Sequence, residues 1–168
     1  RLGLNGKRVV MFLGTPRAHK GVDELFMAME KIKDPSIRLV LIGADASAQS
    51  HVDSMKSNQD KVIIFPKIPF KDLPEHLSAA DILVIPQRDT TDTQGQIPAK
   101  LFDAMAMAKP VITTPLSDIE EVLGGHGYLI NPGNPDELAK TIEYIFANPE
   151  EARLKGLSAR KRCQELYD

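Results

Sequence analysis

The sequence is short of residues that would cross-link the chain or mark a membrane protein. Its 168 residues include one cysteine, no tryptophan and only 5% aromatic residues. A single cysteine, Cys163, cannot form an internal disulfide, so the fold must depend on packing. The sequence also has no apolar run long enough to cross a bilayer and no basic-then-apolar leader. We therefore expect a reducing, cytoplasmic setting.

The sequence also has no large excess of positive or negative charge. The 21 lysines and arginines against 23 acidic residues give a net charge of −2, whereas nucleic-acid-binding domains are normally basic. We expect no nucleic-acid partner, and any anionic ligand must be met by local cations. We also expect no metal, because none of the histidines has a second ligand at metal-site spacing. These histidines are His19, His51, His76 and His126.

What the sequence does contain is an alternation of short apolar runs with segments of helical periodicity. With 42% hydrophobic residues, the chain can bury the core of one domain. The runs predict strands at Arg8–Leu13, Arg38–Ile42, Lys61–Phe65, Asp81–Ile85, Pro110–Thr114 and Gly127–Ile130. The periodicity predicts helices at Gly21–Lys33, near Gln49–Ser57, and at Lys71–Ala79, Ala99–Ala108 and Asp136–Ala147. This pattern predicts an α/β fold, a doubly wound, Rossmann-like parallel sheet in three layers.

A charged helix over residues 149–168 is expected at the end of this single domain, which we assign to residues 1–168. It should lie across the outside, because its face is only partly apolar and consists of Ala152, Leu157, Ala159, Cys163 and Leu166. Its basic run, Lys155 and 160–162, is typical of a solvated face. Contact with another domain or with anionic lipid, at the inner face of a membrane, is the alternative. Since the sequence starts without Met, we expect a piece of a longer protein.

The turns differ between the two edges of the predicted sheet. Loops at the carboxyl ends of the strands carry glycine, proline and cations, whereas the opposite edge has ordinary connections such as 33–36. Because ligands of open parallel sheets bind at the carboxyl ends, a functional cleft is predicted there. The unusual loops are Gly14–Gly21, Gly43–Asp45, Pro66–Pro69 and Pro86–Pro98.

The first of these loops could bind phosphate. Gly14 and Gly21 allow the backbone to approach a ligand, and Arg17 and Lys20 supply charge near a helix N-terminus, which favours anions. The spacing is neither that of a P-loop nor that of a dinucleotide-binding fingerprint. On its own, the loop is more typical of a glycine turn with a solvated lysine.

A second anion site is predicted where Pro98 begins a helix. Proline suits the first turn because its missing N–H costs nothing there. The amides of Ala99, Lys100 and Leu101 would point out of this helix end. One turn further on, Asp103 could accept hydrogen bonds from both hydroxyls of a ribose. The alternative is an acidic residue that only complements the helix dipole.

Four motifs occur in order along the chain: Gly14-x5-Lys20-Gly21, Pro98-Ala-Lys-Leu-Phe-Asp-Ala-Met-Ala106, Lys109-Pro-Val-Ile-Thr-Thr114 and Gly127-Tyr-Leu-Ile-Asn-Pro132. Together they resemble the donor-binding C-terminal domain of retaining GT-B glycosyltransferases, the glycosyl transferase group 1 type (family four). The resemblance covers essentially the whole chain. It implies one half of a GT-B enzyme whose N-terminal, acceptor-binding domain belongs to the same polypeptide outside this sequence.

The resemblance also implies a role for particular residues. The catalytic cations would be Lys20 and Arg17, and the ribose would be bound by Asp103 in place of the usual Glu. The diphosphate would be bound by Gly14, Thr15, Ala99, Lys100 and Leu101, the nucleobase by Lys67, Ile68 and Leu73, and the sugar by Gln94, Gly95 and Gln96. It further implies a UDP- or GDP-sugar donor, no cofactor and no metal, with the leaving phosphate and the cations sharing the developing charge. The acceptor, a sugar or a lipid-linked group, stays unspecified, and this half alone should be inactive.

The chain departs from the family pattern at several positions. Gly95 lies eight residues before Asp103, where the family often has Glu, so this position cannot offer the sugar a carboxylate. Thr15 replaces a usual Arg, whose role Arg17 could take.

Two further departures concern helix ends. Ala108 stands where Gly often ends the helix, and a left-handed residue there would cost roughly 1 kcal/mol. Ser117-Asp118 replaces a glycine pair, and Ser117-Asp-Ile-Glu120 predicts a helix capping box.

Three other functions are consistent with parts of the sequence. A nucleotide-sugar 2-epimerase has the same fold and needs no acceptor. A degenerate family member, as Gly95 allows, would bind nucleotide without catalysis. A flavodoxin-like signalling or interaction domain is the third, although a phosphoreceiver needs an acidic cluster where Gly14-Thr-Pro16 stands.

Overall fold

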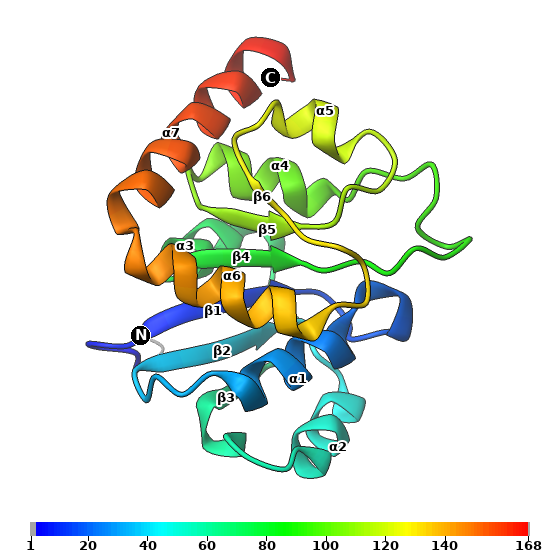
Figure 1. Ribbon diagram of the computed structural model, residues 1–168, viewed down its shortest axis with the longest axis vertical. Helices are drawn as coiled ribbons and strands as arrows, with labels where there is room; N and C mark the ends of the chain where they lie inside the picture. Colours follow the sequence, from blue (N-terminus) through cyan, green and yellow to red (C-terminus); the bar gives the residue numbers. More distant parts are fainter. Residues whose placement is uncertain (1–2, 168) are drawn as a thin grey trace.

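Six parallel strands form the sheet of the structure, a computed structural model that describes residues 3–167 (Figure 1). Their order across the sheet is β3-β2-β1-β4-β5-β6. The strands are β1 (Arg8–Leu13), β2 (Ile37–Ile42), β3 (Val62–Phe65), β4 (Ile82–Ile85), β5 (Val111–Thr113) and β6 (Tyr128–Leu129). Each overlaps a strand predicted from the sequence, so the doubly wound α/β fold is confirmed.

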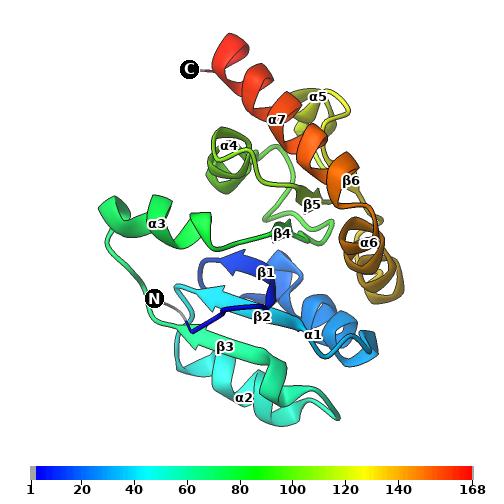
Figure 2. The same ribbon diagram turned by 90° about the vertical axis from the view of Figure 1, so that its left-hand side faces the viewer.

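Helices cover both faces of the sheet (Figure 2). One face carries α1 (Val22–Lys31), α2 (Ala46–Ser54) and α6 (Pro135–Ala147). The other carries α3 (Leu73–Ser78), α4 (Ala99–Ala106) and α5 (Ile119–Leu123). The last helix, α7 (Pro149–Leu166), runs from the first face to the second, because its start packs with α6 and its later turns pack with α4. Single 3₁₀ turns occur at Ala18–Lys20, Gln59–Lys61 and Phe70–Asp72.

The side chains of the sheet alternate between two hydrophobic cores. In β1, Val10 and Phe12 belong to the core under α1 and α6, whereas Val9 and Met11 belong to the core under α4. All four are at most 3% exposed, and burial of a side chain of this size contributes about 1.5–3 kcal/mol. Strands buried on both faces explain the near-continuous apolar runs of the sequence.

The two central strands are joined at their start by Asp81. Its backbone N–H donates to the Val9 carbonyl at 2.9 Å, and its Oδ2 accepts from the Val9 N–H at 2.7 Å. This reciprocal pair fixes β1 beside β4. The carboxyl ends of these strands, where the fold expects a ligand, are thereby held in register.

Two helices begin two or more residues away from the start that the periodicity predicts. α2 begins at Ala46, ahead of the predicted Gln49, because Asp45 Oδ1 caps it by accepting from the Ser47 N–H at 3.0 Å. The helix predicted from Lys71 starts instead with the 3₁₀ turn at Phe70–Asp72 and becomes α-helical at Leu73.

The capping box predicted at Ser117–Glu120 is wrong. α5 begins at Ile119 with Asp118 as its N-cap, and no side-chain hydrogen bond caps it among the described residues. Ser117 has a φ of 52°, a left-handed conformation that favours glycine. Its Oγ accepts a hydrogen bond from the Gly95 N–H at 2.8 Å. The hydroxyl therefore fixes the loop after β4 rather than the helix.

α7 packs closely against the end of α4. Ala108, which follows α4, has a φ of 53°, so the left-handed cap anticipated from the sequence is formed without glycine. On α7, a Cβ at Gly156 would overlap the Ala108 carbonyl. Glycine at this position therefore lets the two helices approach.

The predicted inner face of α7 is partly wrong. Ala152, Ala159 and Cys163 are buried as expected, but Leu157 and Leu166 are 45% and 56% exposed. The inner face is completed by Gly156 instead, because contact with α4 requires the smallest residue. Among the described residues, no helix is long and apolar enough to span a membrane.

Candidate functional site

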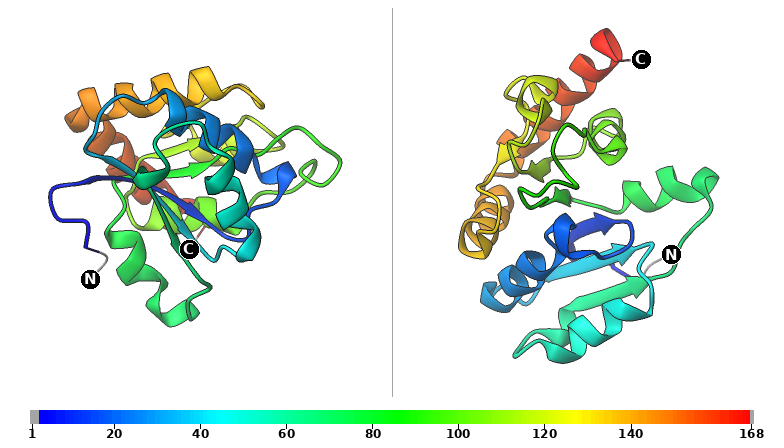
Figure 3. Two further views of the ribbon diagram at one scale, coloured as in Figure 1. Left: turned by 90° about the horizontal axis from the view of Figure 1, so that it is seen from below. Right: turned by 90° about the vertical axis from the view of Figure 1, so that its right-hand side faces the viewer.

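The switch point of the sheet lies between β1 and β4. These strands are neighbours, but the helices that follow them, α1 and α4, pack on opposite faces. A crevice of this kind is the usual ligand site of a doubly wound fold. The β1–α1 loop and the long loop after β4 both project from this edge (Figure 3). A pocket of about 230 Å³ opens here, the switch-point pocket, with a polar lining of His19, Lys20, Gln87, Asp92, Gln96 and Lys100.

Glycines give the β1–α1 loop its close contacts. Gly14 has a φ of 114° and Gly21 a φ of 71°, both in the region that favours glycine. A Cβ on Gly21 would overlap the carbonyl of Pro86, which follows β4. A Cβ on Gly14 would overlap Lys100 Nζ. The loop is therefore shaped so that a side chain from α4 reaches over its backbone.

Two lysine amino groups converge above Gly14. Lys20 Nζ lies 3.6 Å from the position that a Gly14 Cβ would take, and Lys100 Nζ lies closer still. Within the described part of the chain, neither amino group has a carboxylate within 4.0 Å, the limit for a salt bridge. Lys100 Nζ instead lies over the ring of Phe12, 5.6 Å from its centroid.

The pKa values of both lysines are lowered, which shows that their charged forms are destabilised in this pocket. Burial, together with the charge of Lys20, lowers the pKa of Lys100 to about 8, and Asp103 opposes the shift. Burial and the charge of Arg17 lower the pKa of Lys20. Two partly desolvated cations that repel each other would be stabilised by an anion placed between them.

The amino end of α4 opens into the same pocket. The helix begins at Ala99, after Pro98, and both residues line the pocket. The Leu101 N–H donates to the Pro98 carbonyl at 2.9 Å, and its side chain is fully buried. Of the three amides predicted to meet an anion, those of Ala99 and Lys100 therefore remain at the open helix end, because Leu101 closes the first turn.

Asp103 lies one turn into α4 from Lys100. Burial raises the pKa of its carboxyl, and the positive charge of Lys100 acts in the opposite direction. Residues three apart on a helix share one side of it. A half-buried carboxylate beside a cation can accept hydrogen bonds from hydroxyl groups, as its predicted role requires.

The remaining predicted phosphate residues, Thr15 and Arg17, are not among the residues that line the pocket. Thr15 is partly buried after Gly14, and Arg17 is exposed where the 3₁₀ turn begins. Hydrogen bonds from Ser47 lower the pKa of Asp45, and the charge of Arg17 adds to this shift. The charge of Arg17 also adds to the effect of burial on the pKa of Lys20. Arg17 therefore lies near the ends of β1 and β2.

The loop of residues 88–97 is built around a buried threonine. Thr93 is 1% exposed, and its Oγ1 donates to the Arg88 carbonyl at 2.6 Å and accepts from the Thr90 N–H at 3.1 Å. Arg88 anchors the base of the loop to α1, where its guanidinium pairs with Glu24 at 2.6 Å and Asp23 at 3.1 Å. The loop is thus fixed internally and at its base.

The residues predicted to contact the sugar do not form one surface. Gln96 lines the switch-point pocket. Gln94 Nε2 instead donates to Asp89 Oδ1 at 3.2 Å, on the exposed side of the loop. Gly95 has a φ of 72°, and nothing lies within 4 Å of the place for a Cβ. Asp92 belongs to the polar stretch between Thr90 and Gln96 that the resemblance places near the sugar, and it does line the pocket.

The predicted nucleobase residues lie at the carboxyl end of β3, outside the switch-point pocket. β3 is two strands from β1, roughly 10 Å across the sheet. Lys67 is exposed there, whereas Ile68 and Leu73 are partly buried against the core on the α4 face. The three residues therefore share an edge with the pocket but are separated from it.

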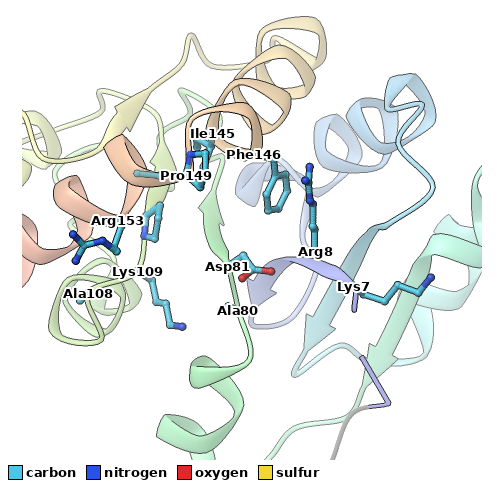
Figure 4. A pocket seen from close by; sticks show the side chains of 12 residues that line it. Lys7, Arg8, Ala80, Asp81, Ala108, Lys109, Ile145, Phe146, Pro149 and Arg153 are labelled. Carbon is cyan, nitrogen blue, oxygen red and sulfur yellow. The ribbon is translucent and has the colours of Figure 1, made fainter. Parts of the chain in front are cut away.

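A larger pocket of about 430 Å³ lies at the opposite edge of the sheet, the amino-edge pocket (Figure 4). Its cations are Lys7, Arg8, Lys109 and Arg153. Arg8 pairs with Asp34 at 3.3 Å, and Lys109 Nζ donates to the Ser78 carbonyl at 2.9 Å. Arg153 makes two hydrogen bonds to Glu150, at 2.9 and 2.7 Å. Two of these four cations, Arg8 and Arg153, are therefore already paired with carboxylates.

Comparison with known proteins decides the family to which this fold and site belong. A family model described as glycosyl transferases group 1 matches residues 7–148. The chain belongs to this family. The four motifs that connect Gly14 to Pro132 lie within the matched part of the group 1 chain.

Relatives of this group 1 chain are about twice its length or longer. TuaC of Bacillus subtilis (strain 168), a putative teichuronic acid biosynthesis glycosyltransferase, is 31% identical over 84% of this chain and 34% of its own length. Sucrose-phosphate synthase from Thermosynechococcus elongatus has a TM-score of 0.83 at 26% identity, over 96% of this chain and 42% of that one. HepE from Anabaena, solved with UDP-glucose, has a TM-score of 0.85 at 19% identity. The match covers 99% of this chain and 46% of HepE. The chain therefore spans less than half the length of these proteins.

Proposed function

We propose that this group 1 chain is the domain that binds the nucleotide diphosphate-sugar donor of a glycosyltransferase. The observation that carries the proposal is the convergence of the Lys20 and Lys100 amino groups over Gly14, at the amino end of α4. Two desolvated cations and a helix N-terminus complement the charge of a diphosphate. The shared fold with HepE, which was solved with UDP-glucose, supports a donor of this class.

The proposed donor lies across the carboxyl edge of the sheet. Its diphosphate contacts the backbone at Gly14 and Thr15 and the amides of Ala99 and Lys100. Its ribose hydroxyls donate to Asp103, and its base, uracil or guanine, lies toward β3. The nucleobase residues in this proposal are Lys67, Ile68 and Leu73.

In the whole protein, we propose transfer of the sugar to an acceptor held by an N-terminal domain of the same polypeptide. The length of the relatives, about twice that of this chain or more, supports a second domain. As the bond between the sugar and the phosphate breaks, Lys20, with Arg17 nearby, stabilises the charge on the leaving phosphate. We propose a retaining, metal-independent reaction in the cytoplasm, and we expect the isolated domain to be inactive.

Gly95 favours a second candidate, a family member that binds nucleotide but transfers no sugar. Its φ of 72° and the open space around it leave the loop without a side chain at the position of the family Glu. Activity of the full-length protein separates the two candidates. Loss of transfer in Lys20→Ala, with the fold intact, supports the catalytic one, whereas an unchanged cellular function supports the second.

A nucleotide panel tests the donor site on this chain. We expect UDP or GDP to raise the melting temperature at millimolar concentration and to give a saturating signal in calorimetry. ADP and CMP complete the panel, and uridine and guanosine, which lack phosphate, are the controls. If no nucleoside diphosphate stabilises the chain, the proposal is wrong.

A further inference from the structure

The switch-point pocket contains a carboxylate among its cations. Asp92 lines the pocket together with His19, Lys20 and Lys100. Its Oδ2 lies 4.0 Å from His19 Nδ1, and its side chain is 73% exposed. The carboxylate therefore stands at the mouth of the pocket, beside the cations and accessible to a ligand.

We propose that Asp92 is the residue that recognises the sugar of the donor, by accepting hydrogen bonds from hexose hydroxyls next to the diphosphate. The inference rests on the proposed donor site. An ionised carboxylate only accepts hydrogen bonds, and sugar hydroxyls can donate them. Because Lys20 and Lys100 hold the diphosphate in this pocket, a sugar attached to it extends toward the pocket mouth.

The neighbouring residues of the loop are less suited than Asp92 to accept hydrogen bonds from the sugar. Gly95 has no side chain, and its N–H is already donated to Ser117 Oγ at 2.8 Å. Gln94 is bonded to Asp89 on the exposed side of the loop. Gln96 lines the pocket but carries a neutral amide, which accepts hydrogen bonds less strongly than a carboxylate.

The loop that carries Asp92 is held on both sides of it. Thr93, the next residue, is buried and bonded to the Arg88 carbonyl at 2.6 Å. Ser117 Oγ accepts from the Gly95 N–H and lies 3.5 Å from the Thr93 carbonyl. Ser117 keeps a φ of 52°, a strained value for serine that persists only where the surrounding contacts impose it. Ser117 is therefore a positioning residue for Asp92.

The test compares the affinity of this chain for UDP with that for UDP-glucose, and for GDP with that for GDP-mannose, by calorimetry. In Asp92→Asn, we expect the sugar nucleotide to bind about tenfold more weakly relative to the nucleotide alone, because a charged acceptor is lost. The matched control is Asp89→Asn, which removes an exposed carboxylate of the same loop outside the pocket lining. It should leave this ratio unchanged.

Ser117→Ala gives a second readout, because it leaves the Asp92 carboxylate in place. We expect it to weaken the sugar nucleotide selectively, with the melting temperature and the affinity for the nucleotide alone close to wild type. An unchanged ratio in Asp92→Asn overturns the inference, and so does an equal loss in Asp89→Asn. If neither UDP nor GDP binds the wild-type chain, the proposed donor site itself is wrong and the inference fails with it.

Discussion

The pockets at the two edges of the sheet differ in how their cations are balanced. The amino-edge pocket is the larger, about 430 Å³ against about 230 Å³. Arg8 and Arg153 are paired there with carboxylates, and Lys109 with a carbonyl. At the switch point, Lys20 and Lys100 face each other instead, and the charge of Lys20 adds to the burial that lowers the pKa of Lys100. Burial lowers the pKa of Lys109 too, but there the charge of Asp81 opposes the shift. The close approach of two amines, and not the volume of the pocket, therefore favours the switch point as the candidate ligand site.

The backbone conformation also differs between the two pockets. At the switch point, Gly14 and Gly21 have positive φ values, and the amino end of a helix faces the cavity. At the amino edge, Gly156 and Ala108 serve only the contact between α7 and α4. This difference in the backbone favours the switch point as the candidate ligand site.

The largest expected effect comes from removing both amino groups of the switch-point pocket. Each charge-assisted contact with phosphate contributes about 1.5–3 kcal/mol, so the affinity for UDP or GDP should fall about tenfold in Lys20→Ala or Lys100→Ala and about a hundredfold in the double variant. Arg153→Ala at the amino edge is the control and should bind normally. A similar loss in Arg153→Ala, measured by calorimetry, would contradict the distinction between the pockets.

Asp103→Ala should have the next largest effect. If its carboxylate accepts hydrogen bonds from the ribose, the affinity for the nucleoside diphosphate falls about tenfold. Inorganic pyrophosphate has no ribose and should bind unchanged or more tightly, because a negative charge is removed. Calorimetry with both ligands separates this role from a purely dipolar one, for which neither affinity would fall.

A smaller effect is expected from pH. Because the pKa of Lys100 is about 8, a diphosphate that binds above pH 8 must first recruit a proton to this amine. The affinity should therefore fall a few-fold between pH 7 and pH 9, whereas Lys100→Arg, which stays charged, should show a flatter profile. An identical pH profile in both proteins would show that Lys100 does not contact the ligand.

Lys100 also makes the stability of the free protein depend on pH, but stability should rise with pH where affinity falls. Its folded pKa of about 8 is below the ordinary 10.5, so between these values the unfolded chain binds the proton more readily. The free energy of unfolding of the free protein should therefore rise, as far as Lys100 contributes, as the pH increases through this window.

The smallest expected effect concerns Ala108, beside the amino-edge pocket. Ala108→Gly removes the penalty of a φ of 53° but gives the unfolded chain more freedom. The free energy of unfolding should rise by about 0.5 kcal/mol, as measured by urea denaturation. Nucleotide affinity should not change, and a change in affinity would show that the two edges are coupled.

The strands and the helix at Pro98 could be predicted because their signals are local. Apolar runs, a proline at a helix start and glycine in a loop act over a few neighbouring residues. Ser117 shows where such reasoning fails. Its local pattern matches a capping box, but its hydroxyl bonds to Gly95, 22 residues away in the sequence. No pattern within the segment contains that partner.

The residues of the predicted sugar subsite also depend on contacts that no local pattern shows. Gln94, Gly95 and Gln96 are consecutive, but the fold of the loop around Thr93 directs only Gln96 to the pocket and brings in Asp92. Lys100 was assigned to the phosphate through its amide, and only the structure adds its side chain, over Gly14. A contact between residues 86 positions apart has no periodicity that would reveal it.

By itself, the sequence determined the doubly wound fold, and it led to the edge of the sheet and the residues that we propose for phosphate and ribose. These depend on burial patterns and turn residues, which are properties of short segments. Only the tertiary structure decided that the Lys20 and Lys100 amines converge and that Asp92 enters the same pocket. Electrostatic repulsion and desolvation depend on distance in space, and folding sets that distance only when β1 and β4 meet.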